Sequence, residues 1–342
     1  MNIKKYVLDD MDRCYCNAHM KIDGEDFFIF ASEANPGVCI AYHGNDFSKK
    51  EVIWDNVGGT MSIIPFEDRQ GEFLAITEMY LKESPSRATV LWAKRTNGNW
   101  TIKPVMYLPY LHRIDIYNVD GKNYFVGSTI ARFKLNKEDW NQPGQIYVGE
   151  IPNDLNNENI KLKLLVDNRY INHGYCRDYE NNIPCGYFGS EEGLIKVLPP
   201  HDNNDWSYEE ILKGRIGEIG LLDINDDGRK ELITIEPFHG NKIAIYQNIN
   251  NEYSQVYQYS NSIDFAHALC SGTINNIKTF IIGIRKADEE LAMIQYQNDK
   301  YIETIIDKEV GPANCSLVNI NNKTYILSSN HTSKKACIYE ID

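Results

Sequence analysis

Short polar turns recur along this sequence, and each lies between two runs in which apolar residues alternate with polar ones. Examples are "KIDGEDFFIFASE", "NVDGKNYFVGST" and "NINNKTYILSSN". The seven turns lie 45 to 61 residues apart and centre on Asp23, Asp68, Asp120, Asn181, Asp227, Asn275 and Asn321. About four short strands per repeat of this length are typical of one β-propeller blade. The repeat therefore predicts an all-β protein, a seven-bladed β-propeller.

The two ends of the sequence complete the pattern. After Val310 only three strands are predicted, and the N-terminal "IKKYVLD" supplies a fourth, so we expect an N-terminal strand to close the last blade. The prediction is one domain over residues 1–342, with blades that start near residues 14, 57, 110, 169, 216, 262 and 310. The third repeat is longer because of "NKEDWNQPGQ" and "IPNDLNNENI", which we expect to be surface loops. A pair of β-sandwiches is the alternative, but it does not predict evenly spaced turns.

Charge and composition exclude several classes of function. Forty-eight acidic residues against 35 basic ones give a net charge of −13, which disfavours binding to a nucleic acid. The sequence has neither an apolar run of about eighteen residues nor an N-terminal secretion signal, so we expect a cytoplasmic protein without a membrane partner. The eight cysteines are expected to be reduced thiols, with Cys176 and Cys185 as the alternative pair. The oligomeric state is left open.

The segment "DINDDGRKE" has the residues of a calcium-binding loop. It places oxygen ligands at positions 1, 3, 5 and 9 and a glycine, Gly228, where the chain must bend; the ligands are Asp223, Asn225, Asp227 and Glu231. This segment resembles the FG-GAP or VCBS repeat family, whose propeller blades carry such a loop between their first two strands. The resemblance implies one structural calcium ion. A hairpin turn rich in Asp and Asn, without a metal, is the alternative.

Polar residues gather at one predicted end of the blades. In a propeller, the loops that lead into each first strand and the loops between each second and third strand open on the same face, around the central channel. The first set of loops contains His19, His112, His173, His267 and Asn314. The second set contains Glu33, Glu78, Arg132, Glu236, His239, Arg285 and His331. Six of the eight histidines fall in these loops, which indicates a site at the channel mouth.

These residue types suggest metal-assisted chemistry. We expect a zinc, manganese or iron ion to be held by His173, His239, His267 and His331, because neutral imidazoles suit these metals. A histidine that makes only structural hydrogen bonds is the alternative at each position. The predicted catalytic residues are His112, His19, Tyr110, Arg132, Arg285 and Glu236. Among them a histidine or tyrosine would remove a proton, and the arginines would bind anionic oxygens.

The C-terminal phrases "EPFHGNKIAIYQ", "FAHAL" and "GPANCSLVNINNKTYILSSNHTSKKACIYEI" resemble propeller proteins related to aldos-2-ulose dehydratase. The resemblance covers about the last 130 residues. It implies a carbon–oxygen lyase or dehydratase whose substrate is a small carbohydrate: an oxidised sugar, a keto-glycoside or a uronide. A non-catalytic propeller that binds a sugar or a protein is the alternative. The sequence contains neither a Gly-x-Ser-x-Gly elbow nor a phosphate-binding P-loop.

Overall fold

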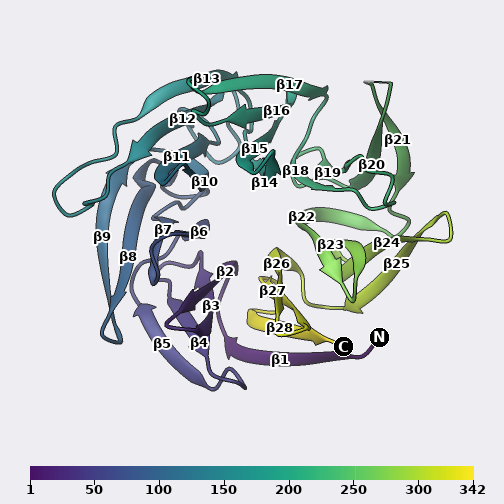
Figure 1. Ribbon diagram of the computed structural model, residues 1–342, viewed down its shortest axis with the longest axis horizontal. Coiled ribbons are helices and arrows are strands. Elements are labelled where there is room, and N and C mark those ends of the chain that lie inside the picture. Colours follow the sequence, from purple (N-terminus) through teal and green to yellow (C-terminus); the bar gives the residue numbers. More distant parts are fainter. Residues whose placement is uncertain (251) are drawn as a thin grey trace. The chain divides into compact units, whose positions relative to one another are not determined.

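Four-stranded antiparallel sheets make up almost all of the structure, a computed structural model that describes residues 1–250 and 252–342. Seven such sheets are formed by the described residues, together with one short 3₁₀ helix, η1 (Pro85–Arg87) (Figure 1). This is the β-propeller class that the repeat predicts. Within the described ranges no helix has the length and apolarity that a membrane span requires.

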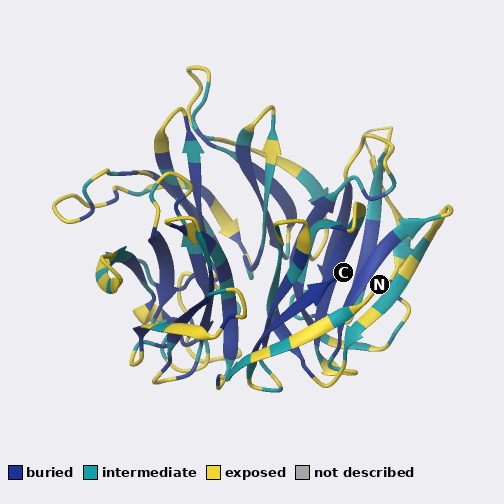
Figure 2. Cartoon of the chain, turned by 60° about the horizontal axis from the view of Figure 1, so that its bottom comes forward, coloured by how far each residue is buried: buried dark blue, intermediate teal, exposed yellow. Residues whose placement is uncertain are grey.

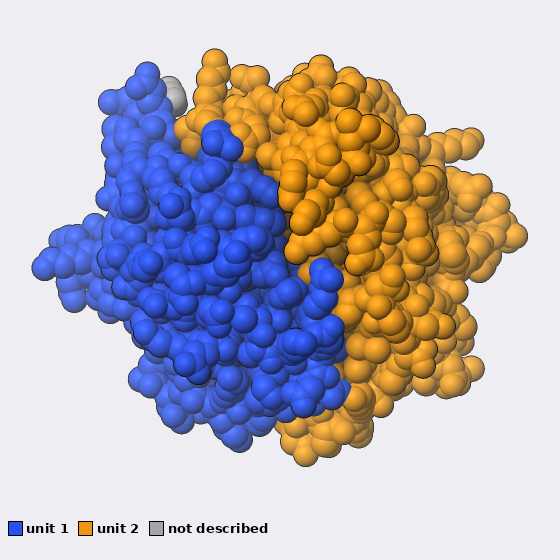
Figure 3. All heavy atoms as spheres, turned by 180° about the vertical axis from the view of Figure 1, so that it is seen from behind, with its two compact units in different colours: residues 1–17, 215–342 blue, residues 18–214 orange. Residues whose placement is uncertain are grey.

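The chain divides into two compact units, residues 18–214 and residues 1–17 with 215–342, which Figure 3 colours separately. Strand β2 is shared: its residues 14–17 belong to the unit of residues 1–17 and 215–342, and its residues 18–22 belong to the unit of residues 18–214. The strands of its sheet are β2 (Cys14–Ile22), β3 (Glu25–Ser32), β4 (Cys39–His43) and β5 (Lys49–Trp54). The other sheets of residues 18–214 are β6 (Ser62–Pro65), β7 (Glu72–Thr77), β8 (Thr89–Thr96) and β9 (Asn99–Tyr107); β10 (Leu111–Val119), β11 (Lys122–Thr129), β12 (Gly144–Ile151) and β13 (Lys163–Arg169); and β14 (Gly174–Glu180), β15 (Ile183–Ser190), β16 (Gly193–Leu198) and β17 (Ser207–Lys213).

Three sheets belong to the unit of residues 1–17 and 215–342. Two follow the sequence: β18 (Glu218–Leu222), β19 (Glu231–Glu236), β20 (Lys242–Ile249) and β21 (Glu252–Gln258); and β22 (Ile263–Ile274), β23 (Ile277–Ala287), β24 (Leu291–Gln297) and β25 (Lys300–Asp307). The third has the order β1-β28-β27-β26, formed by β1 (Ile3–Asp10), β26 (Pro312–Ile320), β27 (Lys323–Asn330) and β28 (Lys335–Ile341). Ile3 pairs with Ile341, so the N-terminal strand closes the last sheet, as predicted.

Turn residues explain why the repeat is visible in the sequence. Asp23, Asp120 and Asn181 have φ values of 51°, 51° and 50°, and each lies between the first two strands of a sheet. Asp, Asn and Gly tolerate this left-handed region better than other residues, and tight hairpins require it. The long third repeat arises because residues 130–143 and 152–162 form no strand.

Apolar side chains pack between neighbouring sheets within each unit, and Figure 2 shows buried residues along many strands and exposed ones at the turns and along strands such as β1. In residues 18–214, one core cluster joins Tyr117 and Val148 to Phe188 and Val197. In the other unit, Ile233 and Ile245 share a cluster with Phe280 and Ile294, among others. Full burial of each such side chain contributes about 1.5 to 3 kcal/mol.

A buried ion pair links two first strands in residues 18–214. Arg177 of β14 donates through Nε to Asp115 of β10 at 2.7 Å, and a second guanidinium nitrogen also bonds that carboxylate. Tyr175 donates to the same carboxylate, whose side chain is only 3% exposed. Burial alone would lower the pKa of Arg177, but Asp115 more than offsets it and the pKa is raised. The pair therefore behaves as one charge-compensated contact between β10 and β14.

Replacing Arg177 with Met should reduce the free energy of unfolding by about 3 to 5 kcal/mol, because the buried Asp115 carboxylate would lose its counter-charge. Urea unfolding followed by tryptophan fluorescence measures this change. Lys163→Ala is the control, since it breaks the exposed pair with Asp205 and should cost less than about 1 kcal/mol. Equal effects of the two changes would contradict a structural role for the buried pair.

Candidate functional site

The imidazole of His267 is held in one tautomer by a neighbouring strand. His267 lies in β22, and its Nδ1 is 2.5 Å from the carbonyl oxygen of Ala313 in β26. A carbonyl can only accept, so Nδ1 carries the proton and Nε2 presents a lone pair. Tyr15 lies beside that lone pair, with its hydroxyl 3.3 Å from Nε2. Metal-binding histidines commonly have this arrangement, in which one nitrogen donates to a carbonyl and the other faces the ligand.

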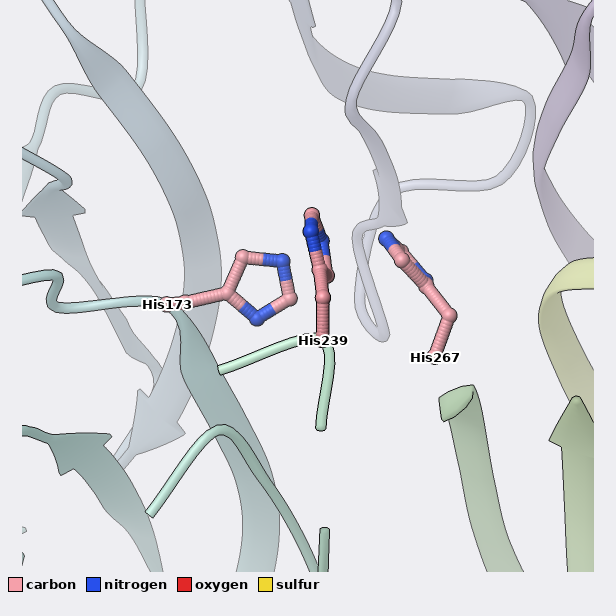
Figure 4. Close-up of side chains that lie close together, drawn as sticks. All are labelled: His173, His239 and His267. Carbon is pink, nitrogen blue, oxygen red and sulfur yellow. The ribbon is translucent and has the colours of Figure 1, made fainter. Parts of the chain in front are cut away.

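His239 stacks against His267 from the turn between β19 and β20. The two ring centroids are 4.9 Å apart, and Figure 4 labels both side chains. Phe238 and Phe265 pack on His239 with centroids at 3.6 and 4.1 Å. His239 and Phe265 have φ values of 49° and 59°, which are unusual for aromatic residues. Such backbone conformations are concentrated at functional sites, so this cluster is the best candidate site in its unit.

His331 has the opposite tautomer. Arg285 donates from a guanidinium nitrogen to Nδ1 of His331 at 2.8 Å. Because a guanidinium has no acceptor, Nδ1 must hold the lone pair and Nε2 must carry the proton. The lone pair of this imidazole is therefore engaged by Arg285. The predicted role of His331 as a metal ligand stays a prediction; in the structure its Nε2–H is a hydrogen-bond donor.

Two cationic side chains, Arg285 and Lys286, lie beside the ring of Phe265. The guanidinium carbon of Arg285 is 4.8 Å from the ring centroid of Phe265, and Nζ of Lys286 is 5.2 Å from the same centroid. The arrangement gathers positive charge and N–H donors beside the aromatic cluster. It is suited to an anionic group of a ligand.

A second histidine pair lies in residues 18–214. His112 is the second residue of β10, and His173, also labelled in Figure 4, directly precedes β14. Their ring centroids are 4.5 Å apart, and both residues are buried, with 2% and 1% exposure. Arg113 donates through Nε to the backbone carbonyl of His173 at 3.1 Å. The two buried rings therefore contact each other between the start of β10 and the start of β14.

His19 and Tyr110 are engaged differently from what the sequence suggests. His19 is the sixth residue of β2, nearer the hairpin turn than the start of the strand, and its Nε2 is 2.9 Å from a carboxylate oxygen of Asp26. The Tyr110 hydroxyl accepts a hydrogen bond from the backbone N–H of Lys134 at 3.0 Å. Burial lowers the pKa of the Lys134 ammonium to about 8, and this group lies over the ring of Trp140. The Tyr110 hydroxyl is thus hydrogen-bonded to the long loop, and the His19 ring is hydrogen-bonded to Asp26.

Arg132 and Glu236 also have local partners. Arg132 forms an ion pair with Asp167 of β13 and donates to the side chain of Asn168 at 3.1 Å. Glu236 accepts hydrogen bonds from Lys242 at 2.9 Å and from the Tyr246 hydroxyl at 2.7 Å. Their predicted catalytic roles stay predictions, and their visible contacts stabilise the sheet edges.

The predicted calcium loop forms the turn between β18 and β19. Asp223 accepts hydrogen bonds from the backbone N–H groups of Asp227 and Gly228 at 3.0 and 3.2 Å. Lys278 lies 2.9 Å from the same carboxylate, and Arg229 pairs with Asp227 at 2.9 Å. The loop is therefore a compact acidic turn whose charges are partly neutralised by two cations.

Glu231 is the buried member of this loop. Its Oε2 accepts the backbone N–H of Ile224 at 2.9 Å, whereas its buried Oε1 has no hydrogen-bond partner within residues 1–250 and 252–342. Burial raises the pKa of Glu231, and the nearby charges of Asp227 and Asp223 raise it further. A carboxylate in this position is destabilising unless a cation joins the loop.

The sequence did not predict three residues that contact the histidines of the His267 cluster: Tyr15, Phe265 and Ala313. Each contacts a histidine through folding and carries no motif of its own. Only "FAHAL" gave an indication, because it places an aromatic residue two positions before His267.

The two tautomers give a direct prediction. In ¹⁵N-histidine NMR spectra at neutral pH, His267 should show a protonated Nδ1 and His331 a protonated Nε2, because their partners are a carbonyl and a guanidinium. Arg285→Met should release His331 from its tautomer and leave His267 unchanged. Identical tautomers in the two residues would contradict the geometry.

Comparisons with known proteins identify the fold alone. No protein-family model and no curated protein matches the chain. The crystal structure of the Saccharomyces cerevisiae Sqt1 is similar, with a TM-score of 0.59 and 9% sequence identity over 98% of both chains. At this identity the similarity shows the β-propeller fold and carries no function. The resemblances to the FG-GAP or VCBS repeats and to the dehydratase propellers gain no support from these comparisons.

Proposed function

We propose that this propeller is a metal-dependent carbon–oxygen lyase that acts on an oxidised sugar, a keto-glycoside or a uronide. The proposed ligands are His239 and His267, which belong to one unit and are labelled in Figure 4, together with His173 as the sequence predicts. The observation that carries the proposal is the fixed tautomer of His267 beside the stacked ring of His239. Imidazole donors favour Zn²⁺, Mn²⁺ or Fe²⁺ over harder cations.

A bound divalent ion would act as a Lewis acid on a carbonyl or carboxylate oxygen of the sugar, which makes the neighbouring C–H more acidic. The chain supplies the remaining functions. Ala313 keeps the Nε2 lone pair of His267 in place, and Tyr15 offers a hydroxyl next to it. A histidine is the proposed proton acceptor, and His112 is the candidate that the sequence predicts for this role.

The cations beside Phe265 explain why an acidic sugar is a suitable substrate. Arg285 and Lys286 provide positive charge, and the Nε2–H of His331 provides a neutral donor. Together they would bind a carboxylate or the anionic oxygens that develop when a proton is removed. A neutral sugar would use fewer of these donors.

Metal binding tests the proposal first. Isothermal titration with Zn²⁺ should show one tight site, and His239→Ala or His267→Ala should weaken it at least about tenfold, as loss of one ligand predicts. His201→Ala is the matched control, because His201 also donates from Nδ1 to a carbonyl, that of Pro199. Affinity should fall as the pH drops through about 6.5, since protons compete for the imidazoles.

Turnover is measured on the metal-loaded protein by the ultraviolet absorbance of unsaturated products from keto-sugars, keto-glycosides and uronides. Loss of product formation in His267→Ala, with normal folding, is the expected result. Sugar binding without product in any substrate class would favour the alternative, a non-catalytic sugar-binding propeller. Absence of metal binding would contradict the metal-dependent proposal itself.

We also propose one structural Ca²⁺ in the loop of Asp223, Asn225, Asp227 and Glu231. The support is Glu231, whose raised pKa reflects a buried carboxylate near two further acids. A carboxyl group whose pKa is raised by folding lowers stability as the pH rises above its unfolded value, about 4.3, so the cost is present at neutral pH. A calcium ion would remove this cost and would displace Lys278 from Asp223.

Glu231→Gln should raise the melting temperature in EGTA, because it removes the buried charge, and should abolish the additional stabilisation by Ca²⁺. Asp227→Ala should also abolish the calcium response. The control is Glu252→Gln, at an exposed residue, which should retain the wild-type response. Differential scanning calorimetry measures all three. A wild-type melting temperature that Ca²⁺ does not change would contradict the calcium proposal.

A further inference from the structure

Two thiols face each other between neighbouring sheets of the unit that contains residues 215–342. Cys270 lies in β22 and Cys315 in β26, and their sulfur atoms are 3.5 Å apart. The Cys315 thiol donates to the Cys270 sulfur, and both residues are half-buried rather than sealed in the core. This pair differs from the Cys176 and Cys185 pair considered from the sequence. In that hairpin the residue opposite Cys185 is Asp178, and the residue opposite Cys176 is Tyr187.

The same two strands hold the candidate site. Cys270 follows His267 by three residues in β22, and Cys315 follows Ala313 by two residues in β26. The bond from Nδ1 of His267 to the Ala313 carbonyl therefore joins the same two strands as the sulfur contact. A change in the spacing of β22 and β26 at the sulfurs is expected to alter that hydrogen bond.

We infer that Cys270 and Cys315 are a redox modification site, which a hydroperoxide closes to a disulfide, and that closure disturbs the histidine site. The Cys270 sulfur, which accepts the hydrogen bond from Cys315, attacks one oxygen of the peroxide, and the proton of the Cys270 thiol passes to the departing oxygen. The O–O bond breaks, Cys270 becomes a sulfenic acid, and the alcohol or water leaves. The Cys315 sulfur then attacks the Cys270 sulfur, the S–O bond breaks, and the S–S bond forms with loss of water. Two thiols are oxidised and one peroxide is reduced.

The order of attack follows from the contacts. The hydrogen bond to Cys270, and then burial, raise the pKa of Cys315, so this group keeps its proton and serves as the second, resolving thiol. Glu218, on the neighbouring β18, adds negative charge that acts in the same direction. Reaction with peroxide is therefore expected to be slow compared with that of an exposed thiolate.

Closure requires the sulfurs to approach from 3.5 Å to about 2.0 Å, a change of about 1.5 Å. The flanking residues resist this movement. Ser271 donates to the carbonyl of Leu221 at 2.9 Å, and Ser316 donates to Asn17 at 2.6 Å, so β22 and β26 are each tied to a second neighbour. The nearby bond from His267 to Ala313 is the contact expected to be distorted, because a shift of this size exceeds the range of hydrogen-bond lengths.

The test uses the full chain, reduced and then treated with hydrogen peroxide. Mass spectrometry after alkylation and proteolysis should find a peptide pair joined through Cys270 and Cys315, lighter by two hydrogen atoms than the two thiol peptides. Cys270→Ser and Cys315→Ser should each abolish it. Cys176→Ser is the matched control, since Cys176 is also half-buried, and it should retain the cross-link. Failure of wild-type protein to form this cross-link would overturn the inference.

The effect on the site is measured by Zn²⁺ titration of reduced and oxidised protein, a step that rests on the proposed function. Oxidation should weaken zinc affinity at least tenfold in wild type and in Cys176→Ser, and not in Cys270→Ser. Dithiothreitol should restore it. Equal affinities in the two redox states would overturn the coupling. A cross-link in a protein that binds no zinc in either state would instead refute the metal proposal and leave the redox pair standing.

Discussion

Hydrogen bonds between β1 and β28 join the first and the last strand in one sheet, and β2, which follows β1, contributes Tyr15 to the His267 cluster. Because β2 follows β1 after a short turn, Tyr15 and Asn17 of β2 lie next to β26. Asn314 donates to the carbonyl of Tyr15 at 2.7 Å, and Asn17 donates to Ser329 at 2.9 Å. These bonds fix the segment whose Ala313 carbonyl orients His267. The closing strand thus stabilises the fold and positions the candidate site.

Charge and hydrogen bonding separate the roles of two histidines in that unit. The carbonyl of Ala313 leaves His267 with a lone pair on Nε2, whereas the guanidinium of Arg285 leaves His331 with a proton on Nε2. One imidazole can bind a metal and the other can donate to an anion. Each role follows from whether the partner of Nδ1 is an acceptor or a donor. A metal site built from His267 and His239 would therefore have a donor-rich side near Arg285.

Much of the fold was accessible from the sequence because its turns have strict chemistry. Left-handed residues such as Asp23 and Asn181 end one strand and begin the next, so the repeat can be read directly. The proximity of His267 and His239 also followed from the position of each in its repeat. The tautomers could not be predicted in this way, because the partner that fixes the tautomer of His267 is Ala313, which is 46 residues away and comes into contact only when β22 packs against β26.

The contacts of His19 and His331 were not predicted, for a related reason, and the roles predicted for these residues stay predictions. The repeat predicts where each residue lies along a strand to within a few positions, and His19 falls nearer its hairpin turn than expected. His331 is at the expected turn, but Arg285 of the preceding sheet occupies its Nδ1. Contacts between sheets, such as this one and the one between Cys270 and Cys315, join residues about one repeat apart, but the repeat does not predict which side chains meet.

X-ray absorption at the zinc edge, on protein loaded with one equivalent of Zn²⁺, tests the metal proposal most directly. Binding at His267 and His239 predicts nitrogen neighbours at about 2.0 to 2.1 Å, with the outer-shell scattering of imidazole rings, and loss of that scattering in His267→Ala. A shell of sulfur at about 2.3 Å would place zinc on Cys270 and Cys315 instead. That result, or a shell of oxygen atoms alone, would contradict the histidine metal site.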